Sequence, residues 1–339
     1  MPTAEFDLIR RCFTRPPVHG AGEVSVVSLV SLGIGDDCAV LQPTPGQQWC
    51  VSTDTLVAGV HFFEDVDAAR LGHKALAVNL SDLAACGATP RAFFLALSLP
   101  RAMAAKEAWC QSLAHGLFAL ADAHGAVLAG GDTTRGPLSL TLTVMGEVPQ
   151  GQALLRSGAR VGDEVWISGD LGGAYLGLQS RREPGRFALG PLFQAAIDRL
   201  ECPQPRVALG QALRGIAHSA IDLSDGLVAD LGHVARASGQ ADGPLHFELD
   251  FDRLPAHPAL ALLDDVQRQQ AILAGGDDYE LAFTAPVGAH AAVLAAAQAS
   301  GTPVHCVGRV RPAQPAEAAV IVVADGQALA PPTGGFVHF

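Results

Sequence analysis

Lysine is almost missing from this chain of 339 residues, which contains only Lys74 and Lys106. No G-x-x-x-x-G-K-[ST] motif occurs, so the chain is not a P-loop enzyme. Lysine and arginine together number 22 against 34 aspartate and glutamate residues, which gives a net charge of −12. This sign opposes attraction to phosphate backbones and to anionic membrane surfaces. We therefore expect neither nucleic acid nor a membrane as a partner.

Paired cysteines and long apolar runs are missing as well. The seven cysteines are scattered without a C-x-x-C pair, which argues against a zinc site or a dithiol redox site. No apolar run approaches the roughly 18 residues of a membrane-spanning helix. The N-terminus carries Glu5 and Asp7 and has no apolar segment of the kind found in signal peptides. These absences predict a cytoplasmic protein with reduced thiols.

Apolar residues are abundant, at 49% of the chain, while charged residues make up only 17%. Such a composition is typical of a globular protein, and the length suits about two domains. Short apolar runs alternate with helical patterns, which predicts an α/β (α+β) fold. A turn-rich segment near residues 147–153 predicts a boundary between an N-terminal domain, residues 1–148, and a C-terminal domain, residues 149–339.

The local patterns predict individual elements. Three- and four-residue spacing of apolar side chains predicts helices over residues 71–85 and 103–124. Residues 181–205 have the weakest signal for regular structure, and the Pro- and Ala-rich residues 312–318 predict a surface loop. Strands are predicted over residues 50–52, 93–99, 126–129, 138–145, 164–168 and 319–323.

Acidic residues gather beside small residues in six segments that follow apolar runs. Each segment alone is explained by a turn, because Asp hydrogen-bonds its own backbone. Together they offer the hard oxygen ligands that Mg²⁺ prefers, and protein-bound Mg²⁺ is commonly shared with substrate phosphates. They therefore predict a nucleotide-phosphate site. The segments are Gly35–Asp37, Ser52–Asp54, Ser81–Asp82, Gly130–Thr134, Asp222–Gly226 and Gly275–Asp278.

Other site assignments stay open at this point. The Gly-rich turn Gly169–Gly173 precedes a helical pattern and can present amides to a phosphate, but such turns are also common without a ligand. Ser224 or Asp225 either caps the helix that follows or belongs to a metal cluster. Among the histidines we single out His61, which is either a half-buried strand residue or a site residue.

Seven longer segments carry a more specific signal. They are Gly33–Ala39, Ser52–Val57, Lys74–Ala85, Gly130–Thr134, Arg156–Ala159, Asp222–Leu227 and Gly276–Leu281. In this order, over nearly the whole chain, they resemble the thiamine-monophosphate kinase family of the aminoimidazole ribonucleotide synthetase-like superfamily. The resemblance implies a two-domain fold: an N-terminal α/β domain that binds ATP and Mg²⁺ and whose sheet pairs with that of a second copy in a homodimer, and a C-terminal α/β domain.

The resemblance also implies an activity and its residues. The activity is the ATP-dependent phosphorylation of thiamine monophosphate to thiamine diphosphate, the last step of thiamine diphosphate biosynthesis. ATP would be bound by Gly131, Asp132, Arg156 and Ser224. Thiamine monophosphate would be bound by His61, Asp277 and Phe336. The Mg²⁺ ligands would be Asp37, Ser52, Thr53, Asp54, Asp82, Asp132, Asp222 and Asp225.

The chemistry of such a transfer needs no covalent intermediate. The nucleophile would be a phosphate oxygen of thiamine monophosphate, which is largely dianionic at pH 7 because the second pKa of a phosphomonoester lies near ~6. No general base is required. Catalysis would consist of in-line positioning and charge neutralisation by several Mg²⁺ ions, with Asp132, Asp225 and Arg156 as catalytic residues.

Two positions depart from the family pattern. The family often has Glu where this chain has Asp277, so a substrate contact would be about one methylene shorter. The segment around Phe336 matches loosely. Two alternatives stay open: another ATP-dependent superfamily member, either selenophosphate synthetase-like or aminoimidazole ribonucleotide synthetase-like, and a nucleotide-binding module without catalysis.

Overall fold

The computed structural model describes residues 5–15, 29–34, 37–104, 106–187, 190–313 and 318–330. The chain divides into two compact units, one of residues 1–83 and 89–151, the other of residues 84–88 and 152–339. Within the described residues, no helix combines the length and the apolar character that crossing a membrane requires.

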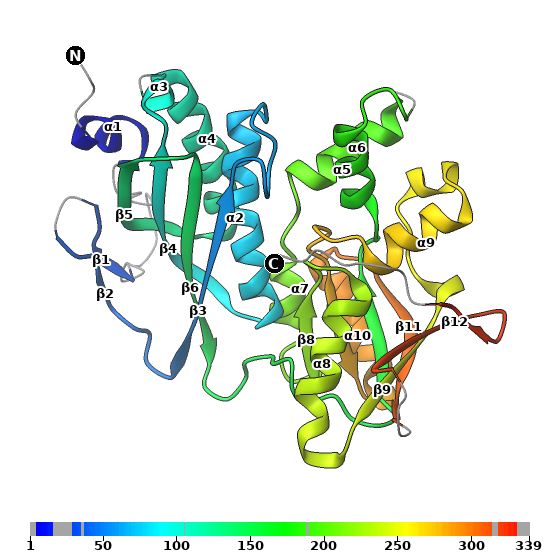
Figure 1. Cartoon of the computed structure of the whole chain (residues 1–339). Coiled ribbons are helices and arrows are strands. Elements are labelled where there is room, and N and C mark those ends of the chain that lie inside the picture. Colours follow the sequence, from blue (N-terminus) through cyan, green and yellow to red (C-terminus); the bar gives the residue numbers. More distant parts are fainter. Residues whose placement is uncertain are drawn as a thin grey trace. The chain divides into compact units, whose positions relative to one another are not determined.

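The first unit is built on a four-stranded sheet in the order β3-β6-β4-β5 (Figure 1). Strands β3, β6 and β4 pair antiparallel, while β4 and β5 pair parallel. Leu140, Leu142 and Val144 alternate with half-buried residues along β6, as expected for a sheet with one covered face. The strands span Gln47–Val57 (β3), Thr89–Leu99 (β4), Val127–Arg135 (β5) and Ser139–Pro149 (β6).

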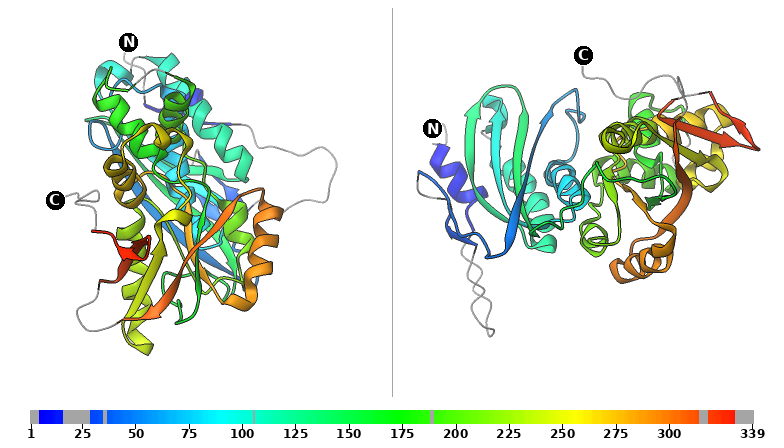
Figure 2. Two further views of the ribbon diagram at one scale, coloured as in Figure 1. Left: turned by 90° about the vertical axis from the view of Figure 1, so that its right-hand side faces the viewer. Right: turned by 90° about the horizontal axis from the view of Figure 1, so that it is seen from below.

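Two 18-residue helices cover one face of this sheet (Figure 2), α2 (Ala68–Ala85) and α4 (Glu107–His124). Their backbones approach closely, because a Cβ on Gly72 would lie 2.0 Å from the carbonyl oxygen of Leu113. Gly116 meets α2 in the same way, at Ala69. The shorter elements are α1 (Glu5–Cys12), α3 (Arg101–Ala104) and the antiparallel pair β1 (Val30–Leu32) and β2 (Val40–Leu41).

The second unit holds a seven-stranded mixed sheet in the order β13-β12-β9-β11-β7-β10-β8. Its strands β7, β8 and β10 are buried along their whole length, which is typical of strands covered on both faces. The strands span Glu164–Ser168 (β7), Ser219–Asp222 (β8), Leu245–Asp250 (β9), Leu281–Ala285 (β10), Val304–Pro312 (β11), Val320–Ala324 (β12) and Gln327–Ala328 (β13).

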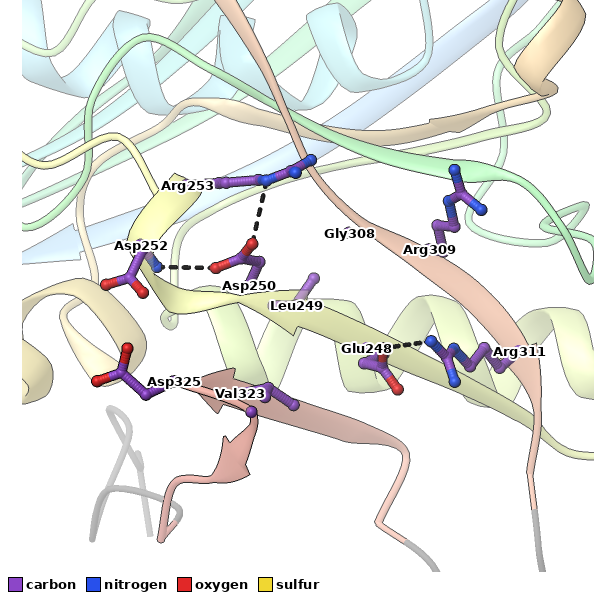
Figure 3. A pocket seen from close by; sticks show the side chains of 11 residues that line it. Glu248, Leu249, Asp250, Asp252, Arg253, Gly308, Arg309, Arg311, Val323 and Asp325 are labelled. Carbon is purple, nitrogen blue, oxygen red and sulfur yellow. Dashed lines mark hydrogen bonds and ion pairs between the residues drawn. The ribbon is translucent and has the colours of Figure 1, made fainter.

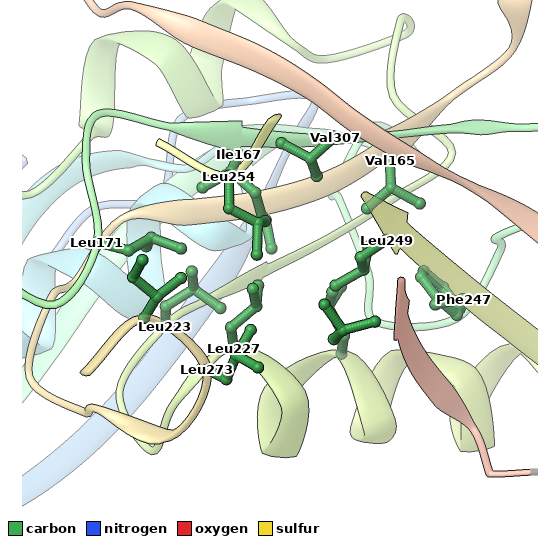
Figure 4. Close-up of a cluster of buried hydrophobic side chains, with 14 of the residues drawn as sticks. Val165, Ile167, Leu171, Leu223, Leu227, Phe247, Leu249, Leu254, Leu273 and Val307 are labelled. Atoms are coloured by element: carbon green, nitrogen blue, oxygen red, sulfur yellow. The ribbon is translucent and has the colours of Figure 1, made fainter. Parts of the chain in front are cut away.

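Helices complete the core of this unit. Val165 and Ile167 of β7 join an apolar cluster with Leu227 and Leu273 (Figure 4), whereas Trp166 points to the other face and stacks on Phe283. The helices are α5 (Gly173–Arg182), α6 (Pro191–Glu201), α7 (Val207–Ala212), α8 (Leu227–Asp242), α9 (Asp265–Ala274) and α10 (His290–Ser300), with short 3₁₀ turns at Phe251–Arg253, Pro258–Leu262 and Val287–Ala289.

The mixed α/β fold is confirmed, and the strand predicted over residues 164–168 has the same limits in the structure. Two local predictions are wrong. Helix α6 lies inside residues 181–205, where the sequence signal for regular structure was weakest. Several acidic segments are not corners, since Asp54 lies inside β3, Asp132 inside β5 and Asp82 inside α2; regular backbone therefore fixes these carboxylates.

Candidate active site

A group of oxygen donors lies between the edge strand β3 and helix α2. The Ser52 hydroxyl donates a 2.5 Å hydrogen bond to the Asp82 carboxylate. The backbone N–H of Asp54 donates to the Asn79 side chain at 3.2 Å. Strand alternation places Ser52 and Asp54 on the same face of the sheet as the buried Leu56, so both face the helix.

The charges of Asp54 and Asp82 oppose one another. Burial, together with the charge and hydrogen bonding of Asp82, raises the pKa of Asp54 to about 6. Two carboxylates beside a hydroxyl form the hard oxygen donor set that Mg²⁺ prefers. A divalent cation would relieve their repulsion, so these residues fit the metal that the sequence predicts.

The other predicted ligands of this unit lie elsewhere. Thr53 is on the opposite, exposed face of β3, where its hydroxyl bonds that of Thr143 at 2.9 Å. Asp37 is exposed in a bend. Across the sheet, Asp54 of β3 pairs with Leu142 of β6, which pairs with Leu95 of β4, which in turn pairs with Gly131 of β5. Asp132 follows Gly131 on this opposite edge strand. Three strand spacings of about 4.8 Å put Asp132 roughly 14 Å along the sheet from Asp54.

Gly131 and His61 hold their positions through backbone contacts. Gly131 has a φ of 149°, and a Cβ there would lie 2.0 Å from the Leu95 carbonyl oxygen, so only glycine fits this point of β5. His61 is half-buried in the turn after β3, where its Nδ1 accepts a hydrogen bond from the Val57 amide at 3.0 Å. This bond fixes the ring, and His61 is a turn residue, not a strand residue.

In the second unit, the loop from β8 to α8 carries three predicted site residues. Asp222 ends β8 and is buried, while Ser224 and Asp225 are half-buried in the bend that follows. Neither Ser224 nor Asp225 caps α8, whose N-cap is Gly226 without a side-chain bond. Instead Asp230, in the first turn of α8, accepts hydrogen bonds from the amides of Asp225 and Gly226, both at 3.1 Å.

Asp230 is a site-supporting residue that the sequence reasoning missed. It is 3% exposed. Burial and the charge of Asp225 raise its pKa to about 7, although bonds from the loop amides act in the opposite direction. An acidic residue in the first turn of a helix, after a loop with Ser and Asp, is a capping signal. The local sequence therefore indicated that Asp230 accepts hydrogen bonds from the loop.

A second loop, between α9 and β10, is bonded to the first. The amide of Asp277 donates to the carbonyl of Ser224 and that of Tyr279 to the carbonyl of Leu223, both at 2.9 Å. Asp277 and Tyr279 have positive φ values of 67° and 51°, a left-handed conformation that costs non-glycine residues on the order of 1–3 kcal/mol each. The inter-loop bonds hold that conformation, so the structure brings the two predicted segments together.

Arg156 belongs to the same neighbourhood of the second unit. Its side chain is exposed, and its carbonyl accepts a hydrogen bond from Ser238 of α8. Burial lowers the pKa of His233, and the charges of Arg236 and Arg156 lower it further while that of Asp225 opposes them. The charges of Arg156 and Asp225 thus both affect the pKa of His233, so the two residues lie in the same region of this unit.

Behind these loops lies a buried ion cluster. Glu280, which is 0% exposed, accepts hydrogen bonds from Ser168 at 2.5 Å, from Arg199 at 2.6 Å and from Nε and Nη2 of Arg206. Burial disfavours the ionised carboxylate, but Arg206 and Arg199 outweigh it and lower the pKa of Glu280. No local pattern marks Arg199 or Arg206, because each meets Glu280 only through the tertiary fold.

The Gly-rich turn Gly169–Gly173 already binds a carboxyl group of the protein itself. The Asp278 carboxylate accepts hydrogen bonds from the amides of Gly172, at 2.7 Å, and Ala174, at 3.3 Å. A Cβ on Gly169 would lie 2.1 Å from a Glu280 oxygen. The amides of Gly172 and Ala174 are thus occupied, and the turn packs around Asp278 and Glu280.

A surface cavity of about 520 Å³ lies at β9, β11 and β12 (Figure 3). Its charges are largely paired within the cavity wall, Arg253 with Asp250 at 3.0 Å and Arg311 with Glu248 at 2.6 Å. None of the predicted site residues lines it. Phe336 lies outside the described residues. In the part of the chain that the structure describes, no three His, Cys, Asp or Glu side chains form a ready metal site.

Comparison with known proteins places this chain among enzymes. Residues 35–148 match the family model of AIR synthase related protein, N-terminal domain. The thiamine-monophosphate kinase of Escherichia coli (strain K12) is 45% identical over 313 residues, 91% of each chain. That of Salmonella typhimurium is 44% identical over 311 residues, also 91% of each chain. The chain belongs to the thiamine-monophosphate kinase family.

Solved structures agree with this membership. The thiamine-monophosphate kinase from Stenotrophomonas maltophilia matches with a TM-score of 0.80 and 44% identity, over 90% of this chain and 93% of that one. AaThiL complexed with AMPPCP and TMP matches with a TM-score of 0.73 and 27% identity, over 90% and 92%. The fold is therefore that of the AIR synthase-like superfamily, and this member of the thiamine-monophosphate kinase family is a kinase.

Proposed function

We propose that the chain transfers a phosphoryl group from ATP to thiamine monophosphate and so forms thiamine diphosphate, the last step of that biosynthesis. The observation that carries the proposal is the 45% identity to a thiamine-monophosphate kinase across 91% of both chains. The complex of AaThiL with AMPPCP and TMP supports this pair of substrates. The residues proposed to bind ATP are Gly131, Asp132, Arg156 and Ser224.

We further propose that Mg²⁺ is the metal. Ser52, Asp54 and Asp82 are the best supported ligands. Ser52 is hydrogen-bonded to Asp82, and the carboxylates of Asp54 and Asp82 repel one another when no cation lies between them. When bound, Mg²⁺ would neutralise phosphate charge during transfer. The remaining ligands rest on the family resemblance alone: Asp37, Thr53, Asp132, Asp222 and Asp225.

The protein's own residues would mainly orient the two substrates and neutralise phosphate charge. A phosphate oxygen of thiamine monophosphate is already ionised at neutral pH, so no side chain has to remove a proton. Arg156 would attract the ATP phosphates, and Asp132 and Asp225 would hold cations. The Asp230 carboxylate fixes the loop amides of Asp225 and Gly226, which keeps the Asp225 backbone in place for in-line transfer.

A homodimer is part of the proposal. The face of β3 and β6 that the helices do not cover carries Thr53, Thr55 and Val51, the last 58% exposed. An open sheet face and an edge strand are surfaces that a second copy can cover. Light scattering during size-exclusion chromatography tests this, with a dimer mass of about twice 35.0 kDa expected. A cytoplasmic location stays a prediction.

Product analysis tests the activity. The purified protein is incubated with ATP, Mg²⁺ and either thiamine monophosphate or thiamine, and the products are separated by chromatography. We expect thiamine diphosphate from the monophosphate alone, and none after EDTA is added. Saturable ATP binding without any thiamine diphosphate would instead favour a sister activity of the superfamily or a binding module.

A further inference from the structure

Tyr279 makes an unusual local arrangement with Asp277. The phenol hydroxyl of Tyr279 donates a hydrogen bond to Oδ1 of Asp277 at 3.1 Å. Tyr279 is only 9% exposed, whereas Asp277 is half-buried. The ring is therefore anchored in the protein interior while its hydroxyl holds a carboxylate nearer the surface.

The backbone around this pair is firmly held. Both residues adopt left-handed backbone conformations, with φ values of 67° and 51°, and between them the buried Asp278 is bonded to the amides of Gly172 and Ala174. The amides of Asp277 and Tyr279 also donate to the Ser224 and Leu223 carbonyls. Strained backbone that persists under so many restraints is typical of functional segments.

We propose that Tyr279 is a positioning residue for thiamine monophosphate, acting through Asp277. A carboxylate attracts cations and hydrogen-bond donors and repels phosphate, so the oriented Asp277 would face either the cationic ring or the amino-bearing ring of the substrate and not its phosphate. The side chain of Asp reaches less far than that of Glu, which weakens a contact with the substrate. The hydrogen bond from Tyr279 fixes the orientation of Asp277 and so limits this weakening. The inference rests on the proposed function, which assigns Asp277 to this substrate.

The decisive variant is Tyr279→Phe, which removes only the hydroxyl and keeps the ring that packs inside. A hydrogen bond to a charged acceptor is worth roughly tenfold or more in an equilibrium constant. We expect KM for thiamine monophosphate to rise about tenfold, with KM for ATP nearly unchanged. The matched control is Tyr175→Phe, because Tyr175 is the only other tyrosine and no hydrogen bond to its hydroxyl occurs among the described residues.

A double-mutant cycle tests whether Tyr279 acts through Asp277. Residues that act as a unit give non-additive effects, so Tyr279→Phe should add little to the effect of Asp277→Asn. Additive effects would overturn the inference. An unchanged KM for thiamine monophosphate would overturn it too, as would equal rises in both KM values together with a lower melting temperature, which indicate a merely structural role.

Calorimetric binding of thiamine monophosphate separates this inference from the kinase assignment. If the wild-type protein forms no thiamine diphosphate but binds the monophosphate, and Tyr279→Phe weakens that binding, the kinase proposal fails and the positioning role stands. If the wild-type protein does not bind thiamine monophosphate at all, both proposals fail.

Discussion

The carboxylate of Asp278 accepts a 2.7 Å hydrogen bond from the amide of Gly172. It thereby satisfies the N-terminus of α5 from a loop more distant in sequence than any helix-capping motif reaches. Such a bond ties two segments of the second unit together through one buried acid. Its protonation therefore bears on stability.

The pH dependence of stability should report Asp278. Burial raises its pKa to about 7, against the bonds from Gly172 and Ala174 and the charge of Arg199. The folded protein therefore retains a proton that the unfolded chain releases above its ordinary pKa of 3.8. This contribution to stability is complete below that pKa and is lost as the pH rises through 7.

Asp278→Asn removes that titration. Relative to this variant, the wild-type protein should lose on the order of 2–3 kcal/mol of unfolding free energy between pH 5 and pH 8. Urea denaturation of both proteins at the two pH values gives the comparison. A difference between them that does not change with pH would contradict the assignment.

Loss of a carboxylate that we propose to be catalytic should remove activity and leave the fold intact. Asp132→Asn and Asp225→Asn each delete one charge without changing side-chain size, and we expect turnover to fall at least about 100-fold. Circular dichroism should stay unchanged. The exposed Asp252 provides the control, and Asp252→Asn should be fully active. Undiminished activity in either of the first two variants would remove that residue from the mechanism.

Mg²⁺ should stabilise the protein without nucleotide. Binding to the Ser52, Asp54 and Asp82 group relieves carboxylate repulsion, and a ligand present at 100 times its Kd adds about 2.7 kcal/mol to the unfolding free energy. A thermal melt with Mg²⁺ should show a higher Tm than one with EDTA and NaCl of matched ionic strength. Asp82→Asn should shrink this difference. An equal rise in the variant would place the metal elsewhere.

The buried ion cluster should be sensitive to loss of its acid. Glu280→Ala leaves Arg199 and Arg206, whose side chains are 18% and 19% exposed, without their shared partner. Breaking a buried pair in this way costs about 3–5 kcal/mol. Glu248→Ala removes a more exposed pair with Arg311 and should cost less than about 1 kcal/mol. Chemical denaturation of both variants measures the loss of unfolding free energy. Similar losses in the two variants would show that the buried cluster contributes no more to stability than the exposed pair.

Local sequence signals predicted helices and strands better than they predicted which residues contact one another in the fold. The strand at residues 164–168 contains three consecutive apolar residues, and the helix over residues 71–85 has apolar residues at helical spacing, so burial follows from each pattern. Helix α6 was missed although its buried residues Phe193, Ala196 and Leu200 have helical spacing. The Gly169–Gly173 turn looked ready for a phosphate, but nothing local to it indicates that Asp278 occupies the amides.

The sequence by itself determined the mixed α/β class, the family, and the residue types available for metal and phosphate chemistry, because these follow from composition, periodicity and ordered motifs. Only the tertiary structure decided which of those residues meet. It joined Ser52 to Asp82, Asp277 to Tyr279 and the Ser224 backbone, and Glu280 to two arginines. It also set Asp132 on the opposite edge of the sheet from Asp54. Strand order and helix packing are global properties, and no local pattern of side chains encodes them.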